Sequence, residues 1–353
     1  MKQQPRFVST FFSIVLLCAL SPFFIQCSLE SRNQEAFSFT GTTMGTTYHV
    51  IIAGETLTSQ QRGALATSVD SALIDFNTIV STYMDQSEIS IFNRNESRYP
   101  IPVSHKLLEV VKAGQNFCFA SGGAFDITVM PIVNFYGFGF EPGENRFPTV
   151  EEIDSWLQLT GCDKLEVGDS ALTKSDPRVT IDLSAIAKGD GSDFIADFLL
   201  KKGYENLFVE IGGEIVTRGV NKEGKPWKIG IDRPTIGGAP GADLQQVVQI
   251  TDMAIASSGD YRNYREVEGK RISHTIDPRT GSPIAHNLAS VTIIANDCRT
   301  ADGVATCVMV LGPEEGMSWL ENMEGVEGFL ITRESDGSFT EYMTPGFEAY
   351  IVD

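Results

Sequence analysis

The stretch that decides the fold is Val179–Asp193, VTIDLSAIAKGDGSD. It begins with β-branched residues, passes through Asp182 and Ser184, and becomes a Gly-punctuated segment that carries Lys188. This order predicts a strand, a tight turn and the start of a helix. Such a junction presents backbone N–H groups and a positive helix end to an anion, and Lys188 adds a cation. Taken alone, the stretch also fits an ordinary connection in which Asp182 or Ser184 caps the helix.

The composition describes a folded, acidic protein. Its 353 residues suffice for one large domain or two small ones, and 42% of them are hydrophobic. The 46 acidic and 27 basic residues give a formal net charge of −19, and Lys and Arg form no run. We therefore expect no nucleic acid partner, because phosphate binding requires concentrated positive charge. A small anionic ligand is still compatible with a locally basic pocket.

The N-terminus differs from the rest of the chain. Basic residues, Lys2 and Arg6, precede an apolar run over residues 7–25 that is broken at Ser21-Pro22. These are the parts of an export signal. An uncleaved membrane anchor is the alternative, since the run approaches the roughly 20 residues that span a bilayer. The Ser-Pro break favours the signal peptide.

Cys27 lies where a bacterial lipoprotein is cleaved and acylated, although Ile25 and Gln26 depart from the small residues usual before such a cysteine. The sequence leaves acylation of Cys27 open. Residues 1–27 are predicted as a signal peptide of possible lipoprotein type, residues 28–36 as a tether and residues 37–353 as one domain. We expect the domain to be exported to the periplasm, with an inner-membrane lipid anchor if Cys27 is acylated.

Four cysteines follow the predicted signal peptide, Cys118, Cys162, Cys298 and Cys307, and no two form a CxxC pair. Their spacing does not match a metal site, and their apolar surroundings predict small core residues. An oxidising compartment permits a disulfide, but the spacing does not indicate one.

The segment after the tether predicts two strands joined by a tight turn. Phe37–Ala53 reads FSFTGTTMGTTYHVIIA, with a Thr- and Gly-rich turn around Met44. The polarizable thioether of Met44 can lie against a flat ring.

Two amphipathic helices are predicted next. Apolar residues recur at helical spacing over Ser59–Ser81 and again over Ser104–Ser121. Gly122-Gly123 ends the second helix, and Thr149 with Glu152 forms a capping box for a shorter one.

Residues beside two of these helices are candidates for ligand contact. Tyr83 follows the first helix and can stack on a ligand or pack in the core. Ala124, Phe125 and Asp126 follow the Gly pair, whose flexible backbone suits a binding loop as well as a plain helix end.

Strand patterns dominate the second half of the chain. Leu207–Gly219 is an apolar strand interrupted by Gly212-Gly213, which marks a bulge or a close backbone approach. Helices and strands are intermixed without strict βαβ alternation, so we expect an α+β architecture with mixed sheets and packed helices. The other predicted elements are strands over Trp227–Pro234, Leu244–Ile250 and Ser290–Ala295 and a helix over Thr300–Gly312.

Two groups of side chains suggest chemistry. Asp302 and Thr306 lie four residues apart, so they share one face of a predicted helix and offer the oxygen ligands that Mg²⁺ prefers. A first-turn Asp and a packed Thr would give the same pattern without a metal. His274, in SHTIDPRTG, is a candidate general base or a histidine that stabilises its turn. None of the standard nucleophile, zinc or P-loop motifs is present.

Taken together, these segments resemble the FAD:protein FMN transferases of the ApbE type. The resemblance covers nearly all of Phe37–Gly312, and the segments occur in family order. They are GTTMGTTY, STYMDQSEISIFN, GGAFDITV, IDLSAIAKG, EIGGEI, IGIDRP, ASSGDY, HTIDPRTG and TADGVATCVMVLG.

The resemblance implies an ApbE-like, T-fold-related architecture and a periplasmic enzyme that splits the pyrophosphate of FAD. It would transfer FMN to a Thr or Ser hydroxyl of an acceptor protein and release AMP. The implied acceptors are subunits of membrane redox complexes or FMN-binding domains. The implied FAD-binding residues are Met44, Tyr83, Ala124, Phe125, Asp126, Asp182 and Lys188. The implied magnesium ligands are the main-chain carbonyl of Ala185 with Asp302 and Thr306, and the implied base is His274.

Two alternatives stay open at this point. One is an FAD pyrophosphatase that yields FMN and AMP, although an aromatic residue at Tyr83 resembles the transferase form. The other is a non-catalytic flavin-binding lipoprotein, which would not need Asp302 and Thr306.

Overall fold

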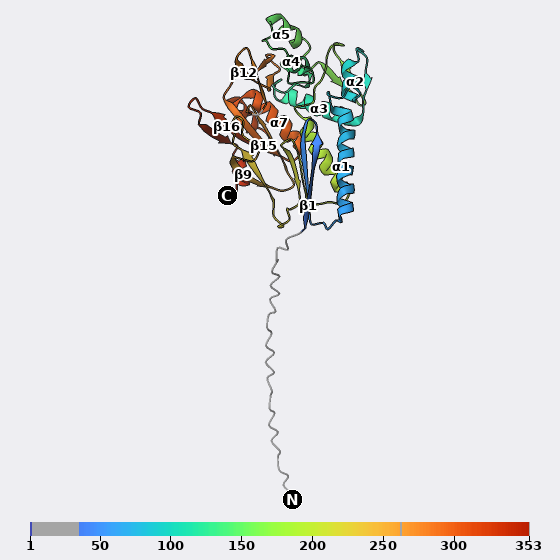
Figure 1. Ribbon diagram of the computed structural model, residues 1–353, viewed down its shortest axis with the longest axis vertical. Coiled ribbons are helices and arrows are strands. Elements are labelled where there is room, and N and C mark those ends of the chain that lie inside the picture. Colours follow the sequence, from blue (N-terminus) through green and yellow to red (C-terminus); the bar gives the residue numbers. More distant parts are fainter. Residues whose placement is uncertain (2–34, 262, 353) are drawn as a thin grey trace. The chain divides into compact units, whose positions relative to one another are not determined.

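The computed structural model describes residue 1, residues 35–261 and residues 263–352. The chain divides into two units, Met1–Arg32 and Asn33–Asp353, and the helices and strands of the described residues belong to the second (Figure 1). The predicted signal peptide, with Cys27, and most of the predicted tether lie outside the described residues. Within the described residues, none of the helices is both long and apolar enough to cross a membrane.

The second unit is built on an eight-stranded sheet with the strand order β1-β2-β6-β7-β10-β15-β16-β17. Every pair of neighbouring strands is antiparallel. The chain therefore enters the sheet at one edge and reaches the other edge near its C-terminus. The strands are β1 (Ala36–Thr43), β2 (Thr46–Ala53), β6 (Leu207–Ile211), β7 (Glu214–Arg218), β10 (Ala254–Gly259), β15 (Leu288–Ala295), β16 (Glu327–Arg333) and β17 (Phe339–Met343).

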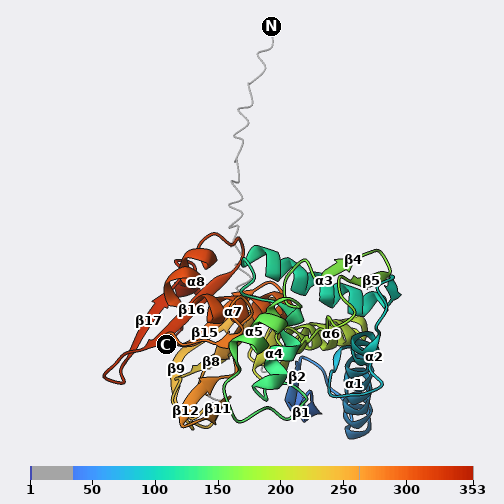
Figure 2. The ribbon, with the colours of Figure 1, turned by 90° about the horizontal axis from the view of Figure 1, so that it is seen from above.

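Helices cover one face of this sheet. Helix α1 (Ser59–Val80) lies beside β1 and β2, and α6 (Ala187–Lys201) packs on β6 and β7 (Figure 1). Helix α7 (Cys298–Leu311) packs on β10 and β15, and α8 (Pro313–Leu320) follows it (Figure 2). Alternate apolar side chains of the strands form the buried cores beneath these helices.

Part of the opposite face is also buried. The hairpin of β8 (Trp227–Asp232) and β9 (Leu244–Ile250) packs there with a short 3₁₀ helix, Phe347–Tyr350. All eight residues of β15 are buried as a result, because this strand is covered from both sides.

A second group of elements precedes α6 in the sequence. Ser87 caps α2 (Glu88–Arg94), Ser104 caps α3 (His105–Ala120), and Thr149 with Glu152 forms the predicted capping box of α5 (Val150–Leu157). Figure 1 shows α5 and α4 at the end of this unit away from the start of β1.

The remaining short elements lie on both sides of α6 in the sequence. Before α6 are β3 (Ile101–Pro102), a 3₁₀ helix (Ile127–Val129), α4 (Met130–Phe135), β4 (Leu165–Val167) and β5 (Ala171–Lys174). After α6 are β11 (Tyr264–Val267), β12 (Lys270–Ser273), β13 (Ile276–Asp277) and β14 (Ser282–Pro283).

The predicted α+β architecture is confirmed, as are the first hairpin and the long helices. Two local predictions are wrong. The start of the opening stretch, residues 179–186, forms no strand, because its backbone bonds to loops and to a side chain instead of a sheet. Leu207–Gly219 is two strands, since Gly212 and Gly213, with φ of 66° and 111°, make the two-residue turn between β6 and β7.

The cysteine prediction is wrong for one pair. Cys118 at the end of α3 is bonded to Cys162, with the Cα atoms 5.6 Å apart. The two residues are 44 positions apart, and only the packing of α3 on the loop before β4 brings them together. Cys298 and Cys307 are buried and free, as expected for small core residues.

Candidate active site

The candidate site lies where the first turns of α6 meet α7 and two hairpin turns of the sheet. The β1–β2 turn approaches α6 closely, since a Cβ on Gly191 would lie 2.9 Å from Cε of Met44. The β6–β7 turn also approaches α6, since a Cβ on Gly212 would lie 3.2 Å from Cδ of Lys188. Segments from distant parts of the sequence therefore converge around Lys188.

The predicted metal ligands come together at the contact of α6 and α7. Thr306 Oγ1 lies 3.4 Å from the carbonyl oxygen of Ala185, to which it donates a hydrogen bond. Asp302, one turn earlier in α7, is 4% exposed, and its Oδ2 accepts a hydrogen bond of 2.9 Å from the Gly189 N–H. One carboxylate, one hydroxyl and one carbonyl therefore share a small region.

This donor set fits magnesium better than zinc. All three groups offer oxygen, and Mg²⁺ takes one or two protein carboxylates and completes its shell with water and substrate phosphates. Among the described residues, no group of three or more His, Cys, Asp or Glu side chains is arranged to hold a metal ion. Zinc in proteins is bound mainly by nitrogen and sulfur ligands, whereas all three of these donors are oxygens.

Close packing of α6 on α7 depends on Gly189. A Cβ at this position would lie 2.4 Å from the carbonyl oxygen of Cys298 and 2.7 Å from Cβ of Asp302. Because glycine has no Cβ, the α6 backbone reaches α7 and the Gly189 N–H bonds to Asp302. The glycines of the opening stretch therefore permit a helix contact that the sequence pattern alone did not predict.

A buried acidic residue that the sequence analysis did not single out holds Lys188. Glu214, at the start of β7, is 3% exposed, and its Oε1 lies 2.6 Å from Lys188 Nζ. Burial would lower the pKa of Lys188, but the negative charges of Asp302 and Glu214 outweigh burial and raise it. Lys188 therefore stays protonated. Burial raises the pKa of Glu214, and its Oε2 has no hydrogen-bond partner.

Asp182 lies on the extended segment before α6 and does not cap that helix. Its Oδ1 accepts a hydrogen bond of 2.6 Å from the Ser184 N–H, whereas Oδ2 is buried without a partner. Burial raises the pKa of this carboxyl group. An unpartnered buried oxygen is costly unless a ligand donor satisfies it, so Asp182 is well placed to accept a hydrogen bond from a ligand.

The other predicted FAD contacts differ in exposure. Met44 has a φ of 49° at the tip of the β1–β2 turn, and its side chain packs on two apolar clusters. Tyr83 is 65% exposed, and the charge of Asp182 adds to burial in raising the pKa of its hydroxyl. Tyr83 and Asp182 therefore lie within electrostatic range of each other.

The Ala124–Asp126 loop is more enclosed than the sequence suggested. Ala124 and Phe125 are each 1% exposed, and the Phe125 ring packs 5.6 Å from that of Phe117. Asp126 caps the Ile127–Val129 3₁₀ helix, with its Oδ1 accepting hydrogen bonds from the N–H and hydroxyl of Thr128. The 3₁₀ helix that follows the loop contacts the Asp182 segment, because the Asp182 N–H donates to the Ile127 carbonyl at 2.8 Å.

His274 follows β12 and has a defined hydrogen bond. Its Nδ1 lies 2.9 Å from the carbonyl oxygen of Asn263, and its ring contacts the edge of Phe138. A carbonyl can only accept, so Nδ1 carries the proton and Nε2 is left with a lone pair. Burial lowers the pKa of His274, and the positive charge of Lys188 lowers it further. The neutral imidazole is therefore the main form near neutral pH.

The chain is similar to known proteins over nearly its whole length. The profile of the ApbE family matches residues 44–330. A Vibrio cholerae relative named FAD:protein FMN transferase is 40% identical over 335 residues, which is 95% of this chain and 98% of that protein. An Escherichia coli K12 relative of the same name is 36% identical over 350 residues, covering 97% of this chain and 98% of its own.

Solved structures give the same picture. The flavin transferase ApbE from Vibrio cholerae superposes with a TM-score of 0.81 at 40% identity, covering 90% of this chain and 99% of that one. The apo form of the flavinyl transferase ApbE from Pseudomonas stutzeri has a TM-score of 0.79 at 36% identity, covering 90% and 97% of the two chains.

The contact at Gly189 predicts an unusual response to alanine. Alanine favours helices, yet Gly189→Ala should lower the free energy of unfolding by about 1–3 kcal/mol, because its Cβ would meet a backbone carbonyl that cannot rotate away. Urea unfolding measures this change.

A matched control lies in α1. Nothing is within 4 Å of a Cβ placed on Gly63, so Gly63→Ala should raise the unfolding free energy by about 0.5–1 kcal/mol. A Gly189→Ala protein as stable as the wild type would show that α6 and α7 are not in the described contact.

Proposed function

This chain belongs to the ApbE family, and we propose that it is an FAD:protein FMN transferase. It transfers the FMN moiety of FAD to a Thr or Ser hydroxyl of an acceptor protein and releases AMP. The family match and the full-length relatives support this activity. The observation that carries the proposal is the meeting of Ala185 and Thr306, 121 positions apart, beside Asp302 and the charged Lys188.

The reaction exchanges one phosphoester partner for another. The acceptor hydroxyl oxygen attacks the phosphorus of the FMN half of the FAD pyrophosphate, and the bond from that phosphorus to the oxygen shared with AMP breaks. AMP leaves with that oxygen, and the hydroxyl proton passes to a base. FMN is then joined to the acceptor through a phosphoester bond.

His274 is the proposed base. Its Nδ1–H is committed to the Asn263 carbonyl, which leaves the Nε2 lone pair free to take the acceptor proton. An alcohol is a poor nucleophile near neutral pH, so removal of its proton in the transition state lowers the barrier.

Lys188 and the oxygen ligands would stabilise the phosphate charge. Lys188 Nζ is fixed by Glu214 and remains protonated, so it can bind a phosphate oxygen. The Ala185 carbonyl, Asp302 and Thr306 would hold Mg²⁺, which when bound neutralises charge on the pyrophosphate. We propose that Asp182 and Tyr83 bind the remainder of FAD, with Met44 against a flat ring of it.

The proposed activity has a direct test. Full-length protein is incubated with FAD, Mg²⁺ and a candidate acceptor, such as a membrane redox-complex subunit or an FMN-binding domain. We expect the acceptor to gain the mass of FMN less one water, with AMP released in equal amount. Asp302→Ala and Thr306→Val should reduce the rate by at least about 100-fold, because they remove groups that stabilise the transition-state charge. Mass spectrometry and chromatography measure both products.

Two other outcomes would contradict the transferase assignment. Equal release of FMN and AMP with and without acceptor would identify an FAD pyrophosphatase. Binding of FAD without any product, in the wild type and Asp302→Ala alike, would identify a flavin carrier.

The protonation state of His274 should set the pH dependence of the reaction. The base acts as neutral imidazole, and its lowered pKa keeps it neutral below the usual histidine value of 6.5. The pKa that defines the acid limb of the kcat/KM profile should therefore be lower than 6.5. His274→Gln should remove this limb and lower kcat by about 10²–10⁴-fold. The exposed His105 is the control, since His105→Gln should leave the profile unchanged. An acid limb that persists in His274→Gln would exclude His274 as the base.

We also propose that the protein is exported to the periplasm, with cleavage of the signal peptide near Cys27. The Cys118–Cys162 disulfide supports this placement, because disulfides persist in oxidising compartments. The membrane anchor is proposed to be a lipid on Cys27. Mass spectrometry of the mature N-terminus tests this proposal. We expect the mature chain to begin at Cys27 and to carry the mass of the added lipid. A mature chain that still carries residues 1–26 would contradict it.

A further inference from the structure

The side chain of Asn93, at the end of α2, occupies the place of a strand partner beside the opening stretch. Its Oδ1 accepts a hydrogen bond of 2.8 Å from the Ile181 N–H, and its Nδ2 donates one of 2.8 Å to the Ile181 carbonyl. An antiparallel strand would supply the same donor and acceptor pair. One amide side chain therefore satisfies both backbone groups of Ile181.

This clamp acts next to Asp182. The peptide that Asn93 holds through the Ile181 carbonyl is the one that leads into Asp182, whose own N–H is held by the Ile127 carbonyl at 2.8 Å. The Asn93 amide also contacts Met130 Sδ at 3.3 Å. The backbone on the N-terminal side of Asp182 is thus fixed by α2 and by the Ile127 turn, without any sheet.

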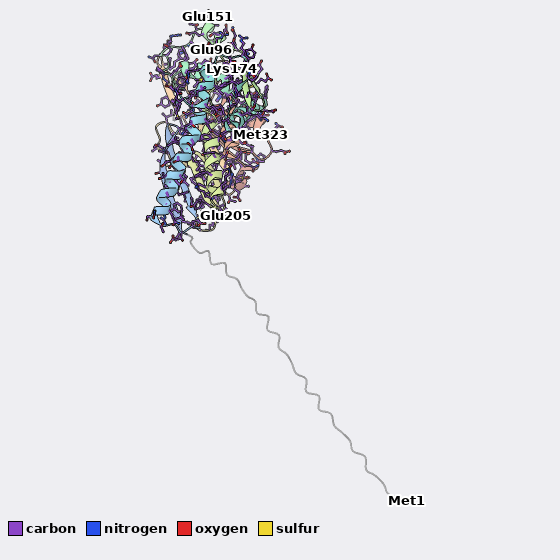
Figure 3. The ribbon with its side chains drawn as sticks, turned by 90° about the vertical axis from the view of Figure 1, so that its right-hand side faces the viewer. Met1, Glu96, Glu151, Lys174, Glu205 and Met323 are labelled. Carbon is purple, nitrogen blue, oxygen red and sulfur yellow. A yellow bond between two sulfur atoms is a disulfide. The ribbon has the colours of Figure 1, made fainter. Side chains whose placement is uncertain are left out.

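Asn93 is itself held by a buried lysine. Lys174 is 1% exposed, and its Nζ donates to the carbonyl oxygens of Asn93 at 3.0 Å and Asn95 at 2.9 Å. These are among the last carbonyls of α2, which have no partner within the helix. Figure 3 labels Lys174 and Glu96 close together near one end of the molecule. Lys174 therefore fixes the end of α2, and α2 presents Asn93 to Ile181.

The side chain that this arrangement orients still has an unused acceptor. Asp182 is 6% exposed, and its Oδ2 has no hydrogen-bond partner. This oxygen is held in position for a ligand donor only if the backbone that carries Asp182 is rigid. The Ser184 N–H holds Oδ1 from within the Val179–Ile186 segment, but this segment belongs to neither a strand nor a helix, so the backbone before Asp182 depends on partners outside it.

We propose that Asn93 is a positioning residue for FAD binding: it clamps Ile181 so that the Asp182 carboxylate is preorganised to accept a hydrogen bond from FAD. The inference rests on the proposed function, in which Asp182 contacts FAD. Asn93 acts through Asp182 and touches no reacting atom.

The test measures FAD affinity separately from turnover and stability. The dissociation constant of FAD is measured by calorimetry on the full chain with Mg²⁺ and no acceptor, and chromatography verifies that FAD stays intact. Asn93→Ala should weaken binding by about tenfold, because the two hydrogen bonds that fix Ile181 are lost. If that variant fails to fold, Asn93→Asp replaces it. It keeps the acceptor for the Ile181 N–H but places a carboxylate oxygen against the Ile181 carbonyl, so a loss of FAD affinity is expected here as well.

A double-mutant cycle with Asp182→Ala separates positioning from general stabilisation, because alanine removes the acceptor that an asparagine would keep. If Asn93 acts through Asp182, adding Asn93→Ala to Asp182→Ala should change the FAD dissociation constant by less than about twofold. A further tenfold loss in that background would overturn the proposal. An unchanged FAD affinity in Asp182→Ala alone would overturn it as well.

Asn206 offers a matched control for the loss of an amide clamp. Its Oδ1 accepts a hydrogen bond of 2.9 Å from the Val220 N–H, and it precedes β6 at the end of the strand opposite the β6–β7 turn. Asn206→Ala should lower the melting temperature as Asn93→Ala does, with unchanged FAD affinity.

If Asn93→Ala also lowers only the melting temperature, Asn93 is merely structural and the proposal fails. A wild-type chain that binds FAD but transfers no FMN would overturn the proposed function instead, while the affinity measurements still decide the role of Asn93.

Discussion

The contact between α6 and α7 is the constraint on which the rest of the site depends. The absence of a side chain at Gly189 lets the two helices approach until a backbone N–H reaches the Asp302 carboxylate. That approach also sets the distance between the Ala185 carbonyl and Thr306. One methyl group at Gly189 would separate the oxygens that the proposed metal requires, so the site depends on backbone packing as much as on its ligands.

Buried charge is the second organising feature. Asp190 in α6 has no exposed side chain and pairs with Lys106 of α3 and Arg299 of α7. Lys188 pairs with Glu214 on the opposite side, beside Asp302. The first set pairs one carboxylate with two cations and joins two other helices to α6. The second contains two carboxylates for one lysine, and burial raises the pKa of both Glu214 and Asp302, which disfavours their charged forms unless a further cation is bound. The proposed Mg²⁺ would supply that cation.

Sequence patterns predicted elements well where a local rule decides them. The long helices follow the apolar spacing, and the predicted Thr149–Glu152 capping box forms, because capping involves residues within one turn. Sequence patterns did not predict the local structure where a residue's bonding partner lies far away in the sequence. Val179–Asp182 has the β-branched composition of a strand, but Asn93 and Ile127 take its hydrogen bonds, so no strand forms. The Cys118–Cys162 bond likewise depends on packing between α3 and a later loop.

The sequence by itself determined the α+β class, the position of the long amphipathic helices, the family resemblance and the residue types that the chemistry requires, because these depend on short-range patterns. Only the tertiary structure decided that Asp182 does not cap α6, that Glu214 holds Lys188, and that Asn93 clamps Ile181. The physical reason is that each of these interactions joins residues from separate elements, whose approach is set by close packing of the whole core. The opening stretch therefore supplies the groups of the site, whereas α2, β7 and α7 fix where those groups lie.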